Sequence, residues 1–328
     1  MAEIKVVCFV ALGADLRKMI DREALPGMNV VSQPLDTDDA TKIELVKDAD
    51  FIILWPGRVS DAVLKAAGKC KLVQLLSAGY DRMNLALTAE LGIPVANNGG
   101  ANSVAVAEHT IMLILACYRR FLIHANRVKA GGWRSTQDLK PDVFEFEGKL
   151  LGLIGIGNIA RKVAQRARAF DARVQYYDKY QRLSPDEEAQ LGITSAPMDE
   201  LLRTSDVVSI HVPLTRETRG MIGRAQLAMM KPSAMIINTS RGGIIDEPAL
   251  VGALMAGTIS AVGLDVLEHE PPDPTETLLH LDNAIITPHN AGPTLESIPK
   301  RAANAFQNIQ RVRDGEPPLW AAVFDSSA

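Results

Sequence analysis

Three short segments in the second half of the chain carry side chains that could do chemistry. Arg241 follows an apolar run and precedes two glycines, acidic residues gather from Asp265 to Glu270, and His289 follows a further apolar run. In doubly wound sheets ligands collect at the carboxyl ends of the strands, so these side chains are expected to face one crevice. Taken singly, Arg241 would suit a surface loop equally well, each acid is more often merely solvated, and a lone histidine is more often structural than catalytic. Their joint occurrence, each just beyond a strand, favours a functional site.

The chemistry open to such a set begins with the arginine. A guanidinium can clamp a carboxylate with two parallel hydrogen bonds. A histidine can exchange a proton near neutral pH, and a carboxylate within hydrogen-bonding distance favours its protonated form.

A glycine-rich turn near the middle of the chain predicts a dinucleotide site. The apolar run Leu150–Ile154 leads into the pattern Gly155-x-Gly157-x-x-Ala160. Gly155 permits a tight turn, and Gly157 lets the backbone approach a pyrophosphate. Ala160 allows the next helix to pack closely, with its N-terminus facing the phosphate charge. The pattern also occurs in other α/β proteins, so its context has to support the assignment.

That context includes an acidic residue at the end of the following strand. Asp178 follows Arg173–Tyr177 and lies 178 − 155 = 23 positions after Gly155, close to the roughly 20 expected of a carboxylate that bonds an adenosine ribose. A carboxylate there repels a 2′-phosphate, which favours NAD over NADP. Lys179 and Arg182 could offset that repulsion, and they keep an NADP-preferring reductase open as an alternative.

Strands and helices alternate along the chain, which predicts an α/β protein with parallel sheets covered by helices. The expected strands are 4–10, 51–54, 72–75, 93–96, 150–154, 173–177, 207–211, 234–238, 260–264 and 284–286. The expected helices include 41–47, 61–67, 85–91, 102–120, 158–170 and 295–313. Two such series predict two doubly wound parallel-sheet domains.

Composition narrows the class of protein. A chain of 328 residues exceeds what one core usually organises, and 47% hydrophobic with 23% charged residues is typical of a globular protein. A net charge of −4 without a long Lys/Arg run argues against nucleic-acid or anionic-membrane partners. Cys8, Cys70 and Cys117 stand in apolar surroundings, which argues against a disulfide framework or metal site and fits the cytoplasm. No signal peptide or membrane span is expected.

In this order, the segments resemble the D-isomer-specific 2-hydroxyacid dehydrogenase family over nearly the whole chain. The matching signatures are Ser77-Ala78-Gly79-Tyr80-Asp81, Ala105-Val106-Ala107-Glu108-His109, the Gly155 turn, His211-Val212-Pro213-Leu214-Thr215, Ser240-Arg241-Gly242, Glu270-Pro271 and Thr287-Pro288-His289. One departure is Asn98-Gly99-Gly100, where the family usually has a Thr-Pro pair.

The resemblance implies a Rossmann cofactor domain inserted in a flavodoxin-like substrate domain. Residues 1–100 and 293–328 would form the substrate domain and residues 101–292 the NAD-binding domain. A homodimer formed through the cofactor domain is also implied.

By the same resemblance, Arg241 binds the substrate, His289 is the general acid/base and Glu270 is its partner. Hydride would pass between NAD(H) and a small 2-keto or D-2-hydroxy acid, with no metal. The implied substrate-binding residues are Ser77, Ala78, Gly79, Arg241 and His289. The implied cofactor-binding residues are Gly155, Gly157, Asn158, Ile159, Asp178, His211, Val212, Pro213, Thr218, Thr239, Ser240, Arg241, Asp265, His289 and Gly292.

Within the family, the segment after the third strand of the substrate domain indicates which substrate is bound; here it follows the expected strand 51–54. Members that act on 3-phosphoglycerate carry Arg side chains there for the phosphate, whereas this chain has Trp55 and Pro56, with only Arg58 as a substitute. An unphosphorylated acid such as glyoxylate or hydroxypyruvate is therefore expected, with D-3-phosphoglycerate dehydrogenase as the alternative. Formate oxidation is disfavoured because that branch has Gln where Glu270 stands. The alternative outside the enzymes is a non-catalytic NAD-sensing scaffold, similar to the family's co-repressors.

Overall fold

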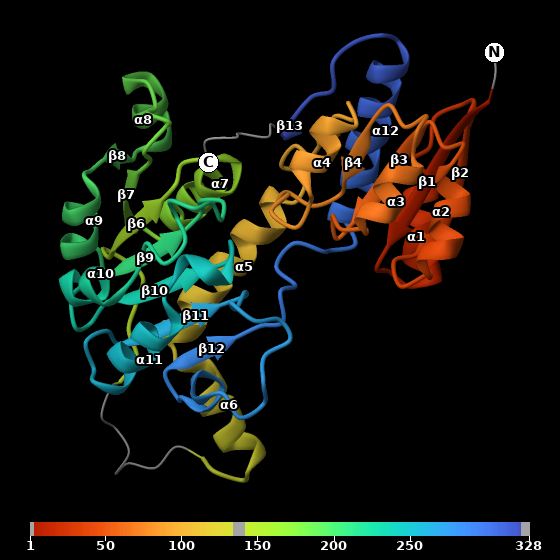
Figure 1. The fold of residues 1–328 in the computed structure, drawn as a ribbon. Helices are drawn as coiled ribbons and strands as arrows, with labels where there is room; N and C mark the ends of the chain where they lie inside the picture. The colour runs from red at the N-terminus through yellow and green to blue at the C-terminus, as the bar shows by residue number, and fades with distance from the viewer. Residues whose placement is uncertain (1–2, 134–141, 323–328) are drawn as a thin grey trace. The chain divides into compact units, whose positions relative to one another are not determined.

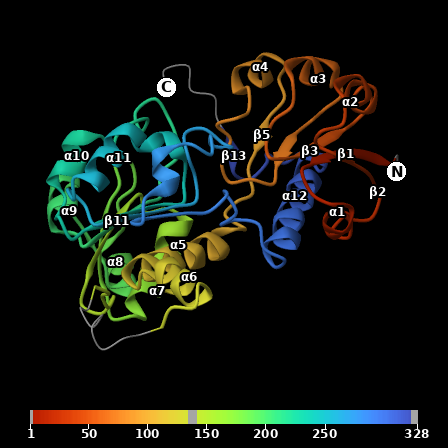
Figure 2. The same cartoon turned by 90° about the horizontal axis from the view of Figure 1, so that it is seen from below.

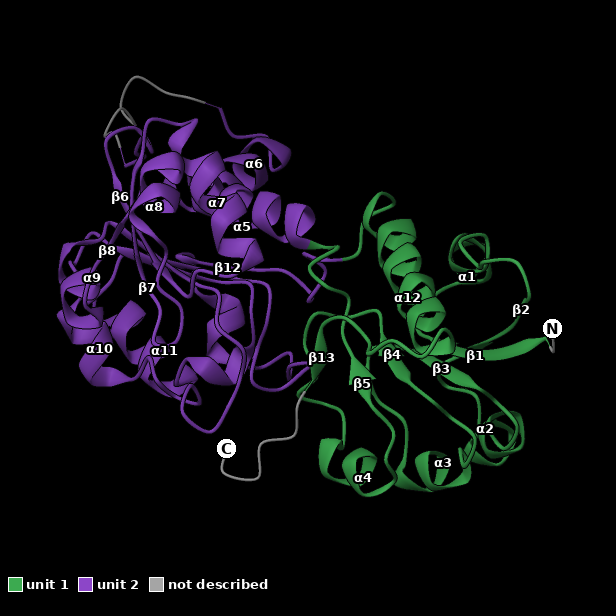
Figure 3. Ribbon diagram, turned by 90° about the horizontal axis from the view of Figure 1, so that it is seen from above, with its two compact units in different colours: residues 1–102, 293–328 green, residues 103–292 purple. Residues whose placement is uncertain are grey.

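The computed structural model describes residues 3–133 and 142–322. The chain divides into two compact units, one formed by residues 1–102 and 293–328 and the other by residues 103–292 (Figure 3). Each unit contains one sheet with helices on both faces (Figure 1). None of the helices in the described ranges is long and apolar enough to cross a bilayer.

The first unit is built on a sheet with the strand order β13-β5-β4-β3-β1-β2. Its strands are β1 (Ile4–Val10), β2 (Met28–Pro34), β3 (Phe51–Trp55), β4 (Val73–Leu75), β5 (Val95–Ala96) and β13 (Ala321–Ala322). The first five are parallel, and β13 pairs antiparallel with β5. The central strands are buried on both faces, which explains their nearly continuous Val, Ile and Leu content.

Two apolar clusters fill the faces of this sheet. One contains side chains of α2 (Asp39–Val46), α3 (Asp61–Ala66) and α4 (Leu85–Glu90). The other contains side chains of α1 (Ala14–Asp21) and α12 (Ser297–Arg313). The last long helix of the chain thus packs on the sheet formed by the first hundred residues (Figure 2).

The second unit has a seven-stranded sheet with the order β12-β11-β10-β9-β6-β7-β8, and all of its pairs are parallel. Its strands are β6 (Leu150–Ile154), β7 (Arg173–Tyr177), β8 (Thr194–Ser195), β9 (Val207–Ile210), β10 (Met235–Asn238), β11 (Ala261–Leu264) and β12 (Ala284–Ile286). From β6 the strands β7 and β8 follow on one side, and β9 to β12 are added on the other side. The carboxyl ends of β6 and β9 are therefore the switch point at which ligands bind in such sheets.

Helices cover both faces of this second sheet (Figure 2). One apolar cluster includes α5 (Ser103–Tyr118) and α7 (Asn158–Arg168), and the other includes α9 (Met198–Thr204), α10 (Arg224–Met229) and α11 (Glu247–Met255). The other helices of the second unit within residues 103–133 and 142–292 are α6 (Phe121–Lys129), α8 (Pro185–Leu191) and two short 3₁₀ turns at Gly242–Ile244 and Thr277–His280.

The predicted fold class, α/β with two doubly wound parallel sheets, is confirmed, although several elements differ from the prediction. Strands β2, β8 and β13 and helices α1 and α6 were not among the elements expected from the sequence pattern. Strand β2 lies at an edge and is only partly buried, and α6 buries none of its residues, so neither has the apolar pattern of a core element. The expected helix 102–120 ends at Tyr118, because Arg120 adopts a left-handed conformation with φ 45°.

Candidate active site

The three chemically suggestive segments follow three neighbouring strands of the second unit. Arg241 comes after β10, Glu270 after β11 and His289 after β12. These strands are adjacent and parallel, so all three segments leave the same edge of the sheet. The sheet therefore brings together residues that are far apart in the chain.

His289 and Glu270 form a direct pair. The imidazole Nδ1 lies 2.8 Å from Oε2 and 3.0 Å from Oε1 of Glu270. An ionised carboxylate can only accept hydrogen bonds, so Nδ1 carries a proton and Nε2 is the nitrogen that can exchange one. The backbone N–H of Leu267 donates to Oε1 of Glu270 at 3.2 Å and helps to fix the carboxylate.

The backbone that carries His289 is unusual, and Asp265 holds it in place. His289 has φ 52°, a left-handed conformation that costs energy for a residue with a side chain. Its N–H donates to the Asp265 carbonyl at 2.8 Å. The Asp265 carboxylate accepts the N–H groups of Asn290 at 3.0 Å and Ala291 at 2.9 Å. Asp265, expected as a cofactor contact, is 1% exposed and supports the turn that presents the imidazole.

The loop of Arg241 is fixed by a buried asparagine at the end of β10. Asn238 donates from Nδ2 to the Arg241 carbonyl at 2.7 Å, and its Oδ1 accepts the Ser240 N–H at 3.0 Å. The Ser240 hydroxyl donates to the Ile210 carbonyl at 2.8 Å. These bonds set the backbone from which the half-buried arginine extends.

Gly242 lets this loop pack directly on the segment that leads to Glu270. A Cβ atom at position 242 would lie 1.9 Å from the carbonyl carbon of Leu267 and 2.3 Å from the nitrogen of Glu268. These are backbone atoms, which cannot move aside as a flexible side chain could. The Arg241 and Glu270 loops can therefore lie against each other only with glycine at 242.

The glycine-rich turn at the switch point has the form that a dinucleotide requires. Gly155 has φ 94°, and a Cβ there would lie 2.7 Å from the His211 carbonyl oxygen. Gly157 faces open space and precedes α7 without a side-chain cap, so the first N–H groups of the helix are available to a phosphate. Ala160 is fully buried against the sheet. These residues fit the pyrophosphate of NAD.

Asp178 stands at the end of β7 beside this turn. Its carboxylate accepts the N–H of Ile156 at 2.9 Å and those of Tyr180 and Gln181 at 2.9 Å. Lys179, which could have softened the repulsion of a 2′-phosphate, pairs with Glu217 at 2.8 Å. Arg182 lies 3.2 Å from the Ser195 hydroxyl.

The segment after β9 adds an uncharged histidine to the switch point. His211 Nε2 lies 2.9 Å from the Ser209 hydroxyl, and burial lowers the pKa of His211 to about 3, so the ring is neutral at physiological pH. Thr218 closes the following turn, with its hydroxyl donating to the Pro213 carbonyl at 2.6 Å and accepting the Thr215 N–H at 2.8 Å.

The expected cofactor residues therefore gather along one edge of the second sheet, where the segments after β6, β7, β9, β10, β11 and β12 begin. Within residues 3–133 and 142–322, no group of three His, Cys, Asp or Glu side chains could hold a metal ion.

Known proteins are similar in sequence to the unit that carries this site. A sequence model of the D-isomer specific 2-hydroxyacid dehydrogenase NAD binding domain matches residues 111–291. A glyoxylate reductase of Korarchaeum cryptofilum is 37% identical over 278 residues, which make up 84% of this chain and 83% of that protein. The chain belongs to the D-isomer specific 2-hydroxyacid dehydrogenase family.

Two further proteins are similar to most of this chain. A D-3-phosphoglycerate dehydrogenase of Archaeoglobus fulgidus is 37% identical over 254 residues, which make up 77% of this chain but only 47% of that protein. The NAD-complexed crystal structure of a family member from Lactobacillus delbrueckii is 25% identical, with a TM-score of 0.80, and covers 97% of this chain and 100% of that one. The present family member is an NAD-dependent oxidoreductase.

The expected substrate loop lies in the first unit, at the carboxyl end of β4. The Ser77 hydroxyl donates to the Gly79 carbonyl at 2.8 Å, which closes a tight turn through Ala78. Arg301 of α12 supports the preceding residue by donating from Nη1 to the Leu76 carbonyl at 2.7 Å. Arg301 is buried, and its guanidinium stacks 4.6 Å from the Trp55 ring centroid.

The departure at Asn98-Gly99-Gly100 has a structural reason in the first unit. Gly99 and Gly100 have φ 61° and 80°, values that a proline ring cannot adopt. A Cβ at Gly99 would lie 2.3 Å from the Trp320 ring. The side chain of buried Asn98 donates to the Leu76 carbonyl at 3.3 Å. This segment therefore connects the region of Trp320 to the substrate loop. The local sequence does not indicate a partner 320 − 99 = 221 positions away.

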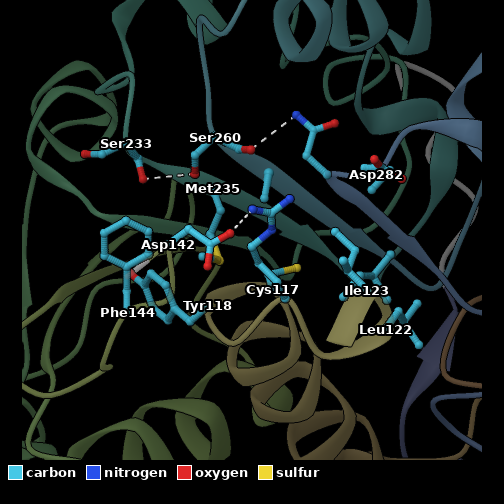
Figure 4. A pocket seen from close by; sticks show the side chains of 15 residues that line it. Cys117, Tyr118, Leu122, Ile123, Asp142, Phe144, Ser233, Met235, Ser260 and Asp282 are labelled. Atoms are coloured by element: carbon cyan, nitrogen blue, oxygen red, sulfur yellow. Dashed lines mark hydrogen bonds and ion pairs between the residues drawn. The ribbon is translucent and has the colours of Figure 1, made fainter. Parts of the chain in front are cut away.

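A separate cavity of about 320 Å³ lies in the second unit, away from these residues (Figure 4). Its lining includes Tyr118 and the ion-paired Arg120 and Asp142, together with Met235 and Ala284 at the amino ends of β10 and β12. The candidate catalytic residues follow the opposite ends of these strands. We therefore place the chemistry at the carboxyl ends and not in this cavity.

Proposed function

We propose that this protein reduces a small 2-keto acid to the D-2-hydroxy acid with NADH, using Arg241, Glu270 and His289. In this proposal residues 103–292 bind NAD, and residues 1–102 with 293–328 form the substrate domain. The observation that carries the proposal is the hydrogen bond of 2.8 Å between His289 and Glu270, beside the loop of Arg241. The family relationship supports the same assignment.

Each member of the trio has a distinct task. Arg241 holds the substrate carboxylate and polarises the carbonyl oxygen, where negative charge develops. NADH, when bound, supplies the hydride. His289 donates the proton from Nε2 to that oxygen, and it removes the proton in the reverse direction. Glu270 keeps Nδ1 protonated and the ring oriented. The backbone of Ser77, Ala78 and Gly79 is a further contact for the substrate carboxylate.

We expect unphosphorylated substrates such as glyoxylate or hydroxypyruvate to be preferred. By the family resemblance, Trp55 and Pro56 lie near where phosphate-binding Arg side chains would stand, and only Arg58 could substitute for them. The Trp55 ring is stacked on Arg301. A steady-state comparison with NADH over glyoxylate, hydroxypyruvate, pyruvate and phosphohydroxypyruvate measures this preference. A kcat/KM far higher for phosphohydroxypyruvate would make the protein a phosphoglycerate dehydrogenase, and inactivity on every 2-keto acid would favour a scaffold.

NADH is expected to give a higher kcat/KM than NADPH. Asp178 places a carboxylate beside the glycine-rich turn, where we expect it to bond the adenosine ribose, and Lys179 is engaged by Glu217. Titration of both cofactors at a fixed substrate concentration tests this, with Asp178→Asn as the companion variant. The variant should narrow the gap between the two cofactors. A preference of the unaltered protein for NADPH would contradict the role given to Asp178.

We also propose a cytoplasmic homodimer formed through the second unit. Met112, Phe121 and Leu122 are 47%, 59% and 45% exposed on α5 and α6, and Met112 and Phe121 line one shallow, largely apolar groove. Light scattering should give about twice the mass of 35.5 kDa, and Phe121→Glu should shift the protein towards the monomer. A monomeric wild-type protein at micromolar concentration would refute the dimer.

A further inference from the structure

His109 belongs to a family signature to which the proposed reaction gives no role. It lies on α5, the first helix of the second unit, and its side chain is 14% exposed. Its Nε2 lies 2.9 Å from the hydroxyl of Thr287, a residue 178 positions away in the chain. Thr287 comes two residues before His289. The helix therefore contacts the turn that carries the proposed acid/base.

The direction of each hydrogen bond follows from the groups available. The Thr287 hydroxyl lies 2.6 Å from Oδ1 of Asp265, and a carboxylate only accepts, so the hydroxyl proton points to Asp265. The Thr287 oxygen must then accept from His109, which places the ring proton on Nε2. Asp265 extends the chain of bonds, because its oxygens accept the N–H groups of Asn290 and Ala291 at 3.0 and 2.9 Å.

The His109 ring carries no charge in this network. Burial lowers the pKa of His109, although the carboxylate of Asp265 acts in the opposite sense, so the ring is neutral near pH 7. A neutral ring can still donate from Nε2 while adding no charge next to the buried carboxylate. The adjacent Thr110 places its hydroxyl 3.0 Å from that of Thr239, so consecutive residues of α5 support the segments after β12 and β10.

We propose that His109 is a positioning residue for His289. Its Nε2–H fixes Thr287, and through Thr287 and Asp265 it stabilises the left-handed turn that directs the His289 imidazole. This inference rests on the proposed acid/base role of His289. It assigns to the helix a part in the reaction that requires no contact with substrate or cofactor.

The kinetic test removes the donor and then restores it. His109→Leu should lower kcat for keto-acid reduction by about 10- to 100-fold, because a misplacement of about 1 Å can cost that much. The solvent deuterium isotope effect on kcat should rise, since proton donation from a displaced His289 becomes slower. His109→Gln keeps an N–H donor near the same place and should recover most of the activity. His124→Leu, on the exposed side of α6, is the matched control.

Thr287→Val provides an independent variant of the same network. If His109 acts through Thr287, the double variant should be no worse than the more damaging single variant, because both remove one pathway. Losses that multiply would show that the two residues act separately. Normal kcat and isotope effect in folded His109→Leu would also overturn the proposal.

Nitrogen NMR of histidine-labelled protein reads the position of His289 without relying on turnover. His109 should have the Nε2–H tautomer, and His109→Leu should shift the ring signals of His289, while His109→Gln restores them. Ring signals of His289 that are identical in His109→Leu and wild type would reject the inference, whatever the activity. If His289 itself proves dispensable for turnover, the proposed function fails, but the NMR result still decides whether His109 positions it.

Discussion

Replacement of His289 by Asn is expected to lower kcat for keto-acid reduction by about 1,000-fold, within the range that general acid–base catalysis contributes. Asn is chosen because it tolerates the left-handed backbone at this position, where φ is 52°. The loss then reports the missing proton donor and not a distorted turn. Dissociation of NADH, followed by its fluorescence, should change little, because the proposed role of the side chain concerns the proton and not the dinucleotide.

Glu270→Gln completes this test. Gln keeps the shape of the side chain but cannot offer two equivalent acceptor oxygens to Nδ1, which now lies 2.8 and 3.0 Å from them. A smaller fall in kcat is expected, with NADH binding again retained. Full turnover in His289→Asn would remove the imidazole from the mechanism.

Arg241→Lys should reduce kcat/KM for the keto acid by about 100-fold even though the positive charge remains, comparable to losing one donor at a developing oxyanion. The guanidinium offers a planar pair of N–H groups that can hold the carboxylate and polarise the carbonyl together. An ammonium group is a point charge and cannot reproduce this geometry. The measurement is steady-state reduction with saturating NADH, and both a higher KM and a lower kcat are expected.

Arg203→Lys on α9 makes the same chemical change at an exposed position and should behave as wild type. Equal kinetics of Arg241→Lys and Arg203→Lys would rule out bidentate binding. Arg241→Ala with added guanidinium offers a rescue experiment, since a small cation that restores activity would show that the missing group acts on the substrate.

Much of the fold and the trio could be predicted because both depend on local patterns. Parallel strands produce apolar runs, and their carboxyl ends meet at one edge, so Arg241, the acidic segment Asp265–Glu270 and His289 could be grouped before any coordinates. Glu270 itself was singled out by the family resemblance. The glycine-rich turn could likewise be predicted, because the spacing of Gly155 and Gly157 between a strand and a helix is a local pattern. Edge and surface elements such as β2 and α6 have weaker patterns and were missed.

The supporting residues of the site could not be predicted in the same way. The bonds from the Asp265 carboxylate to the backbone N–H groups after His289 were not foreseen, while its predicted contact with the cofactor stays a prediction. His109 likewise has its partner, Thr287, 178 positions away in the chain, and only the folded sheet brings the two together. The need for glycine at position 99 is explained by the Trp320 ring, which lies far from it in the chain. Side-chain packing over such distances leaves no periodicity for sequence reasoning to detect.

The left-handed backbone of the proposed acid/base has an evolutionary consequence. Glycine adopts the left-handed conformation of position 289 at a lower energetic cost than any residue with a side chain. The protein is therefore less stable with His289 than it would be with glycine, at the position where we propose the acid/base. Selection for heat tolerance alone would therefore tend to erase this imidazole. If catalysis were no longer selected for, we would expect a descendant that is more stable to heat but has lost the proposed activity.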